Sequence, residues 1–498
     1  MIEQALRAAR RPGVEETGAG LAHSPFRVDR DRIAASPFFA RLAGVTQVVS
    51  PTGAGLIVHN RLTHSLQVAQ VARAIAERIC ADPGSAAAVT ALGGCDADVV
   101  EAAALAHDLG HPPFGHLGEQ VLDRIGRERL GLPDGFEGNA QSFRIVTTID
   151  LHGPGGTGLD LTAAVRAAVL KYPWARFGYP DPHPSGAVPA PRGAGPLPDA
   201  PDAGSAKFSC YSTELDDLRS CRQVFAPVVA PWVQTVEAAV MDTADDIAYA
   251  IHDLEDFHRV GVLQQAGVAA ELVGWQRRAT ADEPWEFGPG ADLERLRRRL
   301  AVKDCWAFDD DAFAAAVARV RDELVDGLLA VAFDGSMAAE RAVAEFSARW
   351  TARLVGEVRV LPDPPLRAAH VTLGLEQWHE VAVLKFVHRR FVLQRADLAS
   401  HQRGQATVLA ALVDALVDWL GERNAPRLPP RLHDLVELAR AEYSATHTAP
   451  AEVNRLARGR AVIDYVASLT DGQAWVLLDV LTGRSGRTGR LWTDAAVL

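Results

Sequence analysis

The chain has 498 residues, of which 48% are hydrophobic and 23% charged. This is a globular composition rather than a disordered one, and the length predicts two or three packed subdomains. A net charge of −12 (51 − 63) argues against non-specific nucleic-acid binding, so no nucleic-acid partner is required.

The N-terminal part begins with a polar segment and continues with two amphipathic helices. Residues 1–35 carry several glycines and arginines and predict a flexible, loosely held arm. Apolar residues recur at helical spacing over residues 62–79, which indicates an amphipathic helix. A second helix is expected over residues 97–109. It stops at residues 110–113, because these include two prolines, which lack a backbone donor and restrict the residue before them.

Three further helices and a proline-rich insertion follow. The pattern predicts helices over residues 117–130, 140–150 and 160–172. Residues 173–206 are rich in proline and glycine and have almost no apolar periodicity, so they cannot bury enough surface to order themselves. We interpret this segment as a surface insertion, either a lid or a mobile loop without catalytic importance.

The remainder of the chain is predicted to be helical. A long helix is expected over residues 233–257, and the C-terminal half is helical by pattern. Breaks in that pattern occur near residues 288–290, 362–365 and 426–430. Neither βαβ alternation nor a GxxxxGK[ST] loop is present, and abundant alanine, leucine and arginine favour helix. We therefore predict an all-α fold with a catalytic domain at residues 36–265 and an extended helical C-terminal region at residues 266–498.

The number and spacing of the cysteines and the length of the apolar runs indicate the cellular compartment. The number of cysteines is odd and none forms a CxxC pair, which predicts reduced thiols rather than disulfides or a thiolate metal site. The five are Cys80, Cys95, Cys210, Cys221 and Cys305. Residues 1–7 lack the apolar stretch of a signal peptide, and the most apolar run, residues 407–420, is interrupted by Asp414 and Asp418. We expect a cytoplasmic protein without a membrane partner.

Ionisable side chains are concentrated at one helix end. Residues 107–119 read His-Asp-Leu-Gly-His-Pro-Pro-Phe-Gly-His-Leu-Gly-Glu. Imidazole and carboxylate groups are the ligands that borderline and hard divalent metals prefer. Because His107 and Asp108 lie at the end of a helix, both can reach one ion. Other ligands must come from other helices, and His64 on the predicted 62–79 helix is one candidate.

The predicted helix over residues 233–257 offers the fourth ligand. Asp245, Tyr249 and Asp253 are spaced by four and therefore share one face. Apolar neighbours indicate that this helix is largely buried, and buried carboxylates need partners. Helical phase favours Asp245 as the ligand, with Asp246 as the alternative.

These motifs together resemble one family. The pattern His64, His107-Asp108 and Asp245 is similar to that of the HD superfamily of metal-dependent phosphohydrolases. Five flanking segments resemble bacterial deoxyguanosinetriphosphate triphosphohydrolases: residues 61–66 (RLTHSL), 107–119, 137–142 (EGNAQS), 170–173 (LKYP) and 244–249 (ADDIAY). The resemblance is clear over residues 35–260.

The resemblance implies hydrolysis of a deoxynucleoside triphosphate (dNTP) to a deoxynucleoside and inorganic triphosphate. The implied metal ligands are His64, His107, Asp108 and Asp245. The implied catalytic residues are His116, its orienting carboxylate Glu119, and His111. The implied substrate contacts are Arg61, Gln47, Lys171, Tyr172, Lys207, Tyr249, Asp253 and Asn139. Among them Arg61 suits bidentate phosphate contact, and Tyr249 would pack against the deoxyribose.

Several alternatives stay open. The chain could be another HD phosphohydrolase, acting on a nucleoside monophosphate or as a phosphodiesterase, or a nucleotide-sensing scaffold without activity. His116 could protonate the leaving 5′-oxygen or position water. The ligand set suits Mn, Mg, Fe, Ni or Zn as the divalent cofactor. A homo-oligomer is expected, with a possible allosteric dNTP.

Overall fold

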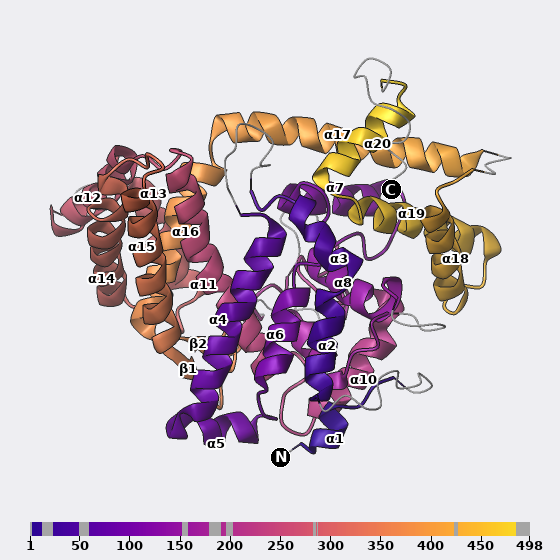
Figure 1. Cartoon of the computed structure of the whole chain (residues 1–498), viewed down its shortest axis with the longest axis horizontal. Coiled ribbons are helices and arrows are strands. Elements are labelled where there is room, and N and C mark those ends of the chain that lie inside the picture. Colours follow the sequence, from indigo (N-terminus) through magenta and orange to yellow (C-terminus); the bar gives the residue numbers. More distant parts are fainter. Residues whose placement is uncertain are drawn as a thin grey trace.

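The computed structural model describes residues 2–11, 23–48, 59–151, 158–178, 191–195, 203–281, 285, 287–422 and 427–484. Over these ranges the chain forms twenty α-helices and one two-stranded sheet (Figure 1), which confirms the all-α prediction. Most of the 173–206 insertion lies outside the described residues, so its interpretation as a lid or a mobile loop stays a prediction. Its described edges are packed, with Trp174 and Arg176 both buried.

The N-terminal segment is packed rather than loose. It contains α1 (Gln4–Arg7), α2 (Pro25–Ala34) and α3 (Pro37–Arg41). Helix α2 packs on α6, and its Phe26 and Ile33 are fully buried. Arg7 is also buried, where it pairs with Glu237 of α11. The predicted flexible arm at residues 1–35 is therefore wrong for the described part of that range, because its polar residues have buried ion-pair partners.

Eight helices build the part of the chain that carries the predicted site. They are α4 (Arg61–Ala81), α5 (Pro83–Ala91), α6 (Ala97–Ala106), α7 (Gly115–Glu128), α8 (Gly138–Arg144), α9 (Ala163–Val169), α10 (Leu215–Phe225) and α11 (Val236–Arg259). Helix α11 packs against α4, α6 and α9 and is buried along most of its length. The expected helix over residues 97–109 ends at Ala106, and the one over residues 160–172 covers only α9. The one over residues 140–150 is α8 followed by a π-helical turn, Ile145–Ile149.

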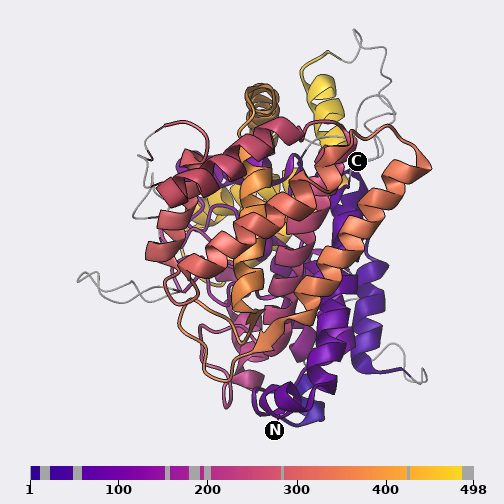
Figure 2. The ribbon, with the colours of Figure 1, turned by 90° about the vertical axis from the view of Figure 1, so that its left-hand side faces the viewer.

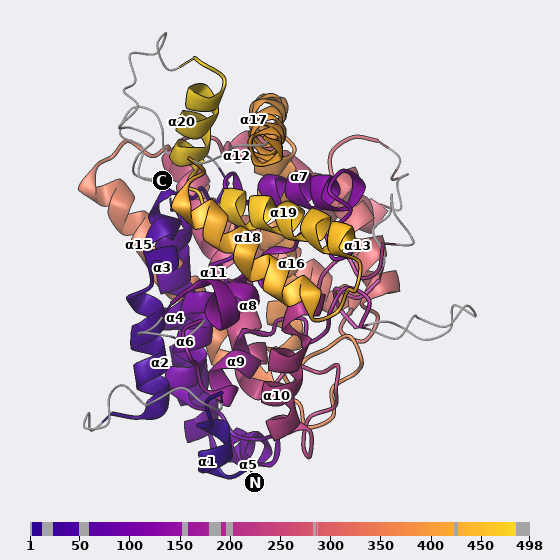
Figure 3. The same ribbon diagram turned by 90° about the vertical axis from the view of Figure 1, so that its right-hand side faces the viewer.

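Nine helices form the C-terminal region. They are α12 (Gln265–Ala281), α13 (Ala291–Lys303), α14 (Asp310–Val320), α15 (Met337–Gly356), α16 (Leu375–His388), α17 (Ala396–Gly421), α18 (Pro430–Ser444), α19 (Pro450–Ala467) and α20 (Asp471–Leu481). Further short turns are 3₁₀ at Leu42–Gly44, Ser212–Glu214 and Leu328–Ala330 and π at Arg321–Val325 and Arg389–Leu393. Helices α12 to α16 gather on one side of α11 (Figures 1 and 2), whereas α18 and α19 pack together on the other side (Figure 3).

A short β-hairpin interrupts the C-terminal helices. Strands β1 (Val358–Val360) and β2 (Val371–Leu373) pair antiparallel, with Val358 opposite Leu373. The expected break near residues 362–365 is present, but the expectation of helix on both sides of it is wrong here. The prolines of residues 362–365 end the helical pattern, and the β-branched valines bury against α4 and α11 instead.

The two predicted regions share one apolar core. A single buried cluster runs from Phe26 to Leu478. The buried side chain of Arg144 on α8 also reaches across to the C-terminal region, where it bonds Asp464 at 3.0 Å and Glu442 at 2.9 Å. The C-terminal helices are thus in position to shape the site.

Two predictions based on composition can be compared with the structure. All five cysteines are free thiols in the structure. In the part of the chain that the structure describes, α17 is the one helix long and apolar enough to span a membrane by length and composition. Its inward face contacts α7, α19 and α20.

Candidate active site

Two helix ends and one helix middle bring the predicted metal ligands together. Asn60 caps α4 with a reciprocal capping box, which places Arg61 and His64 on the buried face of its first turn. His107 and Asp108 follow directly after the last residue of α6. Asp245 comes from the middle of α11. The four side chains thus converge from three helices that pack on one another.

The distances show a compact ligand set. Asp245 Oδ1 lies 3.2 Å from His64 Nε2 and 3.8 Å from His107 Nε2. Asp108 Oδ1 lies 3.4 Å from the same His107 nitrogen. Asp246 points elsewhere, because its carboxylate accepts from Lys385 Nζ at 2.6 Å. The geometry therefore favours Asp245 over Asp246 as the fourth member.

The unsatisfied groups of this cluster fit a divalent metal. His107 Nδ1 donates to the Ala104 carbonyl at 2.6 Å, so the lone pair lies on Nε2. That nitrogen is buried and has no hydrogen-bond partner among the described residues. Two imidazoles and two carboxylates around it are a ligand set that Zn, Mn, Fe or Ni accepts.

Neighbouring cations keep both carboxylates ionised. Burial alone raises the pKa of Asp245, but Lys171, His64 and His107 outweigh burial and hold that pKa well below its usual value. Lys171 Nζ lies 2.7 Å from Asp245 Oδ2. For Asp108, interactions with His107, His111 and Arg61 likewise outweigh burial and lower the pKa. Arg61 donates to Asp108 Oδ2 at 2.8 Å.

A second cluster lies on the turn that opens α7. Phe114 adopts a left-handed conformation with φ 67°, and α7 begins at the next residue. His116 Nδ1 lies 2.8 Å from Glu119 Oε2, three residues along the same helix. The His116 side chain is 63% exposed, so a ligand can reach it, whereas Glu119 is buried. The pair is arranged as a reactive imidazole oriented by a fixed carboxylate.

Glu119 is fixed from several directions. Its Oε1 accepts the Gly138 N–H at 3.0 Å. A Cβ at Gly138 would come within 2.1 Å of that oxygen, so only glycine permits the contact. Burial raises the pKa of Glu119, but interactions with Lys207, His111 and His116 outweigh burial and lower the pKa well below 4.5.

His111 joins the two clusters. Its Nδ1 lies 2.9 Å from Asp108 Oδ1, and its Nε2 lies 3.6 Å from Glu119 Oε1. Burial, helped by the charge of Arg61, lowers the pKa of His111 to about 4. His111 is therefore neutral near pH 7.

The two lysines predicted to contact the substrate lie at different clusters. Lys171 lies beside the proposed metal ligands, and Lys207 lies beside the His116–Glu119 pair. Lys171 bridges Asp245 and Asp242. Lys207 Nζ lies 2.8 Å from Glu137 Oε1 and 3.7 Å from Glu119 Oε2. Each lysine is thus held at the site by carboxylates that an anionic ligand can replace.

Two other predicted substrate contacts lie close to these lysines. Asn139 Nδ2 donates to Glu137 Oε1 at 2.9 Å, so its side chain is turned toward the carboxylate that holds Lys207. The Tyr172 ring is half-buried and lies 5.8 Å from the ring of Trp174.

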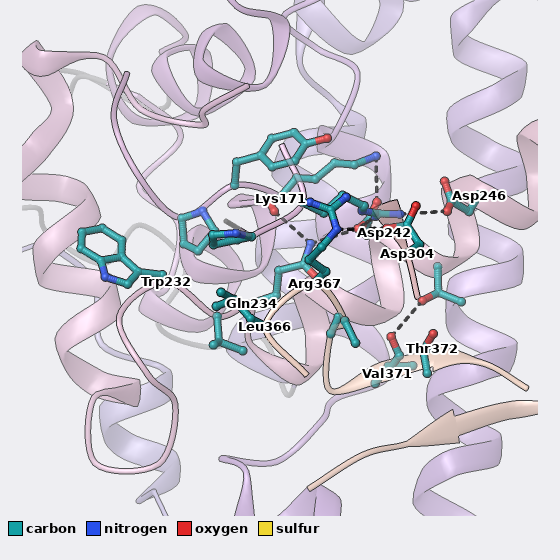
Figure 4. A pocket seen from close by; sticks show the side chains of 18 of the residues that line it. Lys171, Trp232, Gln234, Asp242, Asp246, Asp304, Leu366, Arg367, Val371 and Thr372 are labelled. Carbon is teal, nitrogen blue, oxygen red and sulfur yellow. Dashed lines mark hydrogen bonds and ion pairs between the residues drawn. The ribbon is translucent and has the colours of Figure 1, made fainter. Parts of the chain in front are cut away.

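A cavity of about 160 Å³ opens behind Lys171 (Figure 4). There Lys171 faces Asp242, and Arg367 bonds Asp304 at 3.0 Å. Trp232 lines the opposite side of the cavity from Asp246. The charges that line this cavity are paired with one another.

The residues predicted to contact the sugar are Tyr249 and Asp253 on α11 and Gln47 in the segment before α4. Tyr249 and Asp253 contact His388 of α16, with the two rings 5.2 Å apart and His388 Nδ1 3.3 Å from Asp253 Oδ2. Burial, with the nearby negative charge of Asp256, raises the pKa of Asp253 well above its usual value. The Gln47 Oε1 atom is buried without a partner in the described chain, and the Gln47 carbonyl lies near Gly115.

Sequence reasoning missed three contributors from the C-terminal region. His388 is fully buried against Tyr249, and Lys385 lies 5.7 Å from the centre of the same ring. Asp471, the first residue of α20, accepts the N–H of Phe114 at 2.8 Å and that of Thr46 at 3.2 Å. No spacing relates these residues to the histidine motif, so only the folded chain could reveal them.

Comparisons with known proteins agree with this geometry. Residues 61–143 match the HD domain family, and residues 371–478 match the phosphohydrolase-associated domain family. The fold and the histidine–aspartate cluster thus define an HD-domain phosphohydrolase, a metal-dependent class of hydrolase.

Full-length relatives narrow the class. A deoxyguanosinetriphosphate triphosphohydrolase-like protein of Streptomyces coelicolor is 37% identical, covering 92% of each chain. Proteins with the same description from Corynebacterium diphtheriae (31%, covering 90% of this chain and 89% of the relative) and Bifidobacterium longum (30%, covering 92% and 83%) are also similar. This chain belongs to the deoxyguanosinetriphosphate triphosphohydrolase-like family.

Proposed function

We propose that the chain hydrolyses a dNTP, with dGTP the first candidate, to a deoxynucleoside and inorganic triphosphate. The observation that supports this most directly is the adjacency of two clusters. His64, His107 and Asp245 lie close enough to hold one metal ion, with Asp108 3.4 Å from His107, and His111 connects Asp108 to the neighbouring His116–Glu119 pair. The names of the relatives, deoxyguanosinetriphosphate triphosphohydrolase-like proteins, agree with this substrate class.

The proposed roles in metal binding follow from the donor atoms. His64, His107, Asp108 and Asp245 would hold a divalent ion. When bound, such an ion supplies Lewis-acid chemistry and lowers the pKa of a bound water. Arg61 and Lys171 keep the two aspartates ionised and in place.

His116 is the proposed proton carrier. Its Nδ1 is engaged by Glu119, so proton exchange with the substrate falls to Nε2. A positioned imidazole can protonate the departing 5′-oxygen or take a proton from the attacking water. Glu119 stabilises the charged imidazole in either role. His111, neutral because of its lowered pKa, can contact the triphosphate as a hydrogen-bond donor.

Cations around the clusters would bind the triphosphate. Arg61, Lys171 and Lys207 each contact a carboxylate in the structure. The phosphate oxygens of a dNTP would take over these contacts, and arginine offers two parallel donors. Tyr172 and Asn139 would line this end of the site.

The sugar would lie between α11 and the segment before α4. Tyr249 would pack against the deoxyribose, with Asp253 and Gln47 reading its hydroxyl group. The unpartnered Gln47 Oε1 is available for such a contact. We further propose a cytoplasmic homo-oligomer that an allosteric dNTP can regulate, with the long C-terminal helices as the candidate interface.

Product analysis tests the proposed function. Each of the four dNTPs, alone and in mixtures, is incubated with Mn²⁺ or Mg²⁺, and the products are separated by ion-exchange chromatography. We expect inorganic triphosphate and a deoxynucleoside in equal amounts. Orthophosphate released from a nucleoside monophosphate, without triphosphate from any dNTP, would instead identify a different HD phosphohydrolase.

A further inference from the structure

A basic cavity lies between α13 and α16, among the C-terminal helices on the left of Figure 1. Its volume is about 490 Å³, which is within the range of small-molecule sites. Five of its lining residues are cationic and one is acidic. The cations are Arg295, Arg299, Lys385, Arg389 and Arg390. Such an excess of positive charge is notable in a chain whose net charge is −12.

The internal ion pairs leave part of this charge without a partner. Asp292, the acidic residue, uses one oxygen for Arg295 and the other for Arg390, the latter at 2.5 Å. Lys385 is paired with Asp246. Arg299 and Arg389 have no ion-pair partner in the described part of the chain. Two unpaired guanidinium groups therefore face one cavity.

The two unpaired arginines also affect each other. Burial and the nearby charge of Arg389 both lower the pKa of Arg299, which is the effect of like charges held close together. Arg389 is the first residue of a π-helical turn, Arg389–Leu393. Such turns are frequent at functional sites because they redirect side chains. A bound anion would relieve the repulsion between the two guanidinium groups.

We propose that this cavity binds a small polyphosphate anion, separate from the substrate at the metal centre, between Arg299 and Arg389. Guanidinium groups match phosphate oxygens with paired donors, and several phosphates in a row can contact both arginines at once. The cavity adjoins the candidate active site through Lys385, whose ammonium group lies near Tyr249. The binding site does not depend on which bond the metal centre breaks.

Calorimetric titration of the full-length protein with inorganic triphosphate tests this site. EDTA in the buffer removes metal-bridged binding at the metal centre. We expect the wild type to bind triphosphate, and Arg299→Glu to weaken that binding roughly tenfold to a hundredfold, the value of one or two charged hydrogen bonds. Arg299→Ala should weaken it less. Arg299 is exposed and has no ion-pair partner in the described part of the chain, so neither substitution breaks an ion pair and folding is preserved.

Arg298→Glu is the matched control. Arg298 lies next to Arg299 on α13, pairs with Glu294 at 2.9 Å and does not line the cavity. The Arg298→Glu variant should bind triphosphate as tightly as the wild type does. Equal binding by the wild type and Arg299→Glu, or an equal loss in Arg298→Glu, would overturn the proposal.

A kinetic measurement separates this ligand from the tail of the substrate. With metal present, Arg299→Glu should leave the KM for dGTP unchanged. A rise in KM that parallels the loss of triphosphate binding would assign Arg299 to the substrate site. It would overturn the proposal that the cavity is a separate binding site. Because triphosphate binding is measured without turnover, an inactive protein would contradict the proposed function and leave this test intact.

Discussion

The Asp471→Ala substitution tests whether α20 holds the turn that carries His116. Asp471 is buried and accepts two backbone N–H groups, one from Phe114 and one from Thr46. Phe114 has φ 67°, a left-handed conformation that costs a residue with a side chain about 1–2 kcal/mol. The bond from Asp471 offsets that cost, so its loss lets the turn relax.

The magnitude follows from these bonds. A hydrogen bond to a charged group contributes about 1.5–3 kcal/mol, and water entering the space left by Asp471 can replace part of two such bonds. We expect the free energy of unfolding to fall by about 2–4 kcal/mol. A shift of His116 by about 1 Å should lower kcat by roughly tenfold to a hundredfold, with little change in KM.

Urea denaturation and steady-state kinetics on the same preparation measure both effects. Asp479→Ala, on the same helix and half-buried, is the control and should match the wild type. Asp471→Asn keeps one acceptor and should give intermediate values. A folded Asp471→Ala protein with wild-type kcat would refute the positioning role of α20.

Three further predictions concern the two clusters. His116→Ala should lower turnover by roughly a hundredfold to ten-thousandfold while metal analysis of the purified protein shows unchanged metal content; loss of metal would make His116 a ligand. Asp245→Asn should lose the metal and Asp246→Asn should retain it, and the reverse result would move the fourth ligand by one residue. The pKa of Glu119 is held below the usual 4.5, so its contribution to stability is full above about pH 4.5 and is lost as the pH falls through its folded pKa. Urea titrations at several pH values should show a shallower acid decline for Glu119→Gln, whereas an identical decline would exclude this linkage.

The sequence predicted the features that depend on near neighbours. Helical periodicity located α4 and α11. The family resemblance paired His116 with Glu119, and these two side chains lie 2.8 Å apart on α7. The four-residue step from Asp245 to Tyr249 favoured Asp245 over its neighbour. Such features can be predicted because side-chain direction in a helix repeats with a fixed period.

The same reasoning was wrong where distant contacts decide conformation. The polar N-terminal segment is packed because Arg7 pairs with Glu237, 230 positions away. Strands β1 and β2 form where an all-helical pattern was expected, because their valines bury against α4 and α11. Neither Glu237, the partner of Arg7, nor the helices that cover the two strands can be predicted from local composition.

The proposed metal ligands and the His116–Glu119 pair could therefore be predicted from the sequence alone, from motifs and their resemblance to a family. Only the tertiary structure decided what surrounds them. It brought Asp471 to the turn at Phe114 and His388 to Tyr249, and it opened the basic cavity between α13 and α16. The physical reason is that these contacts join segments far apart in the chain, 98 positions for Asp292 and Arg390 and 357 for Phe114 and Asp471, and their geometry arises only when the shared core forms.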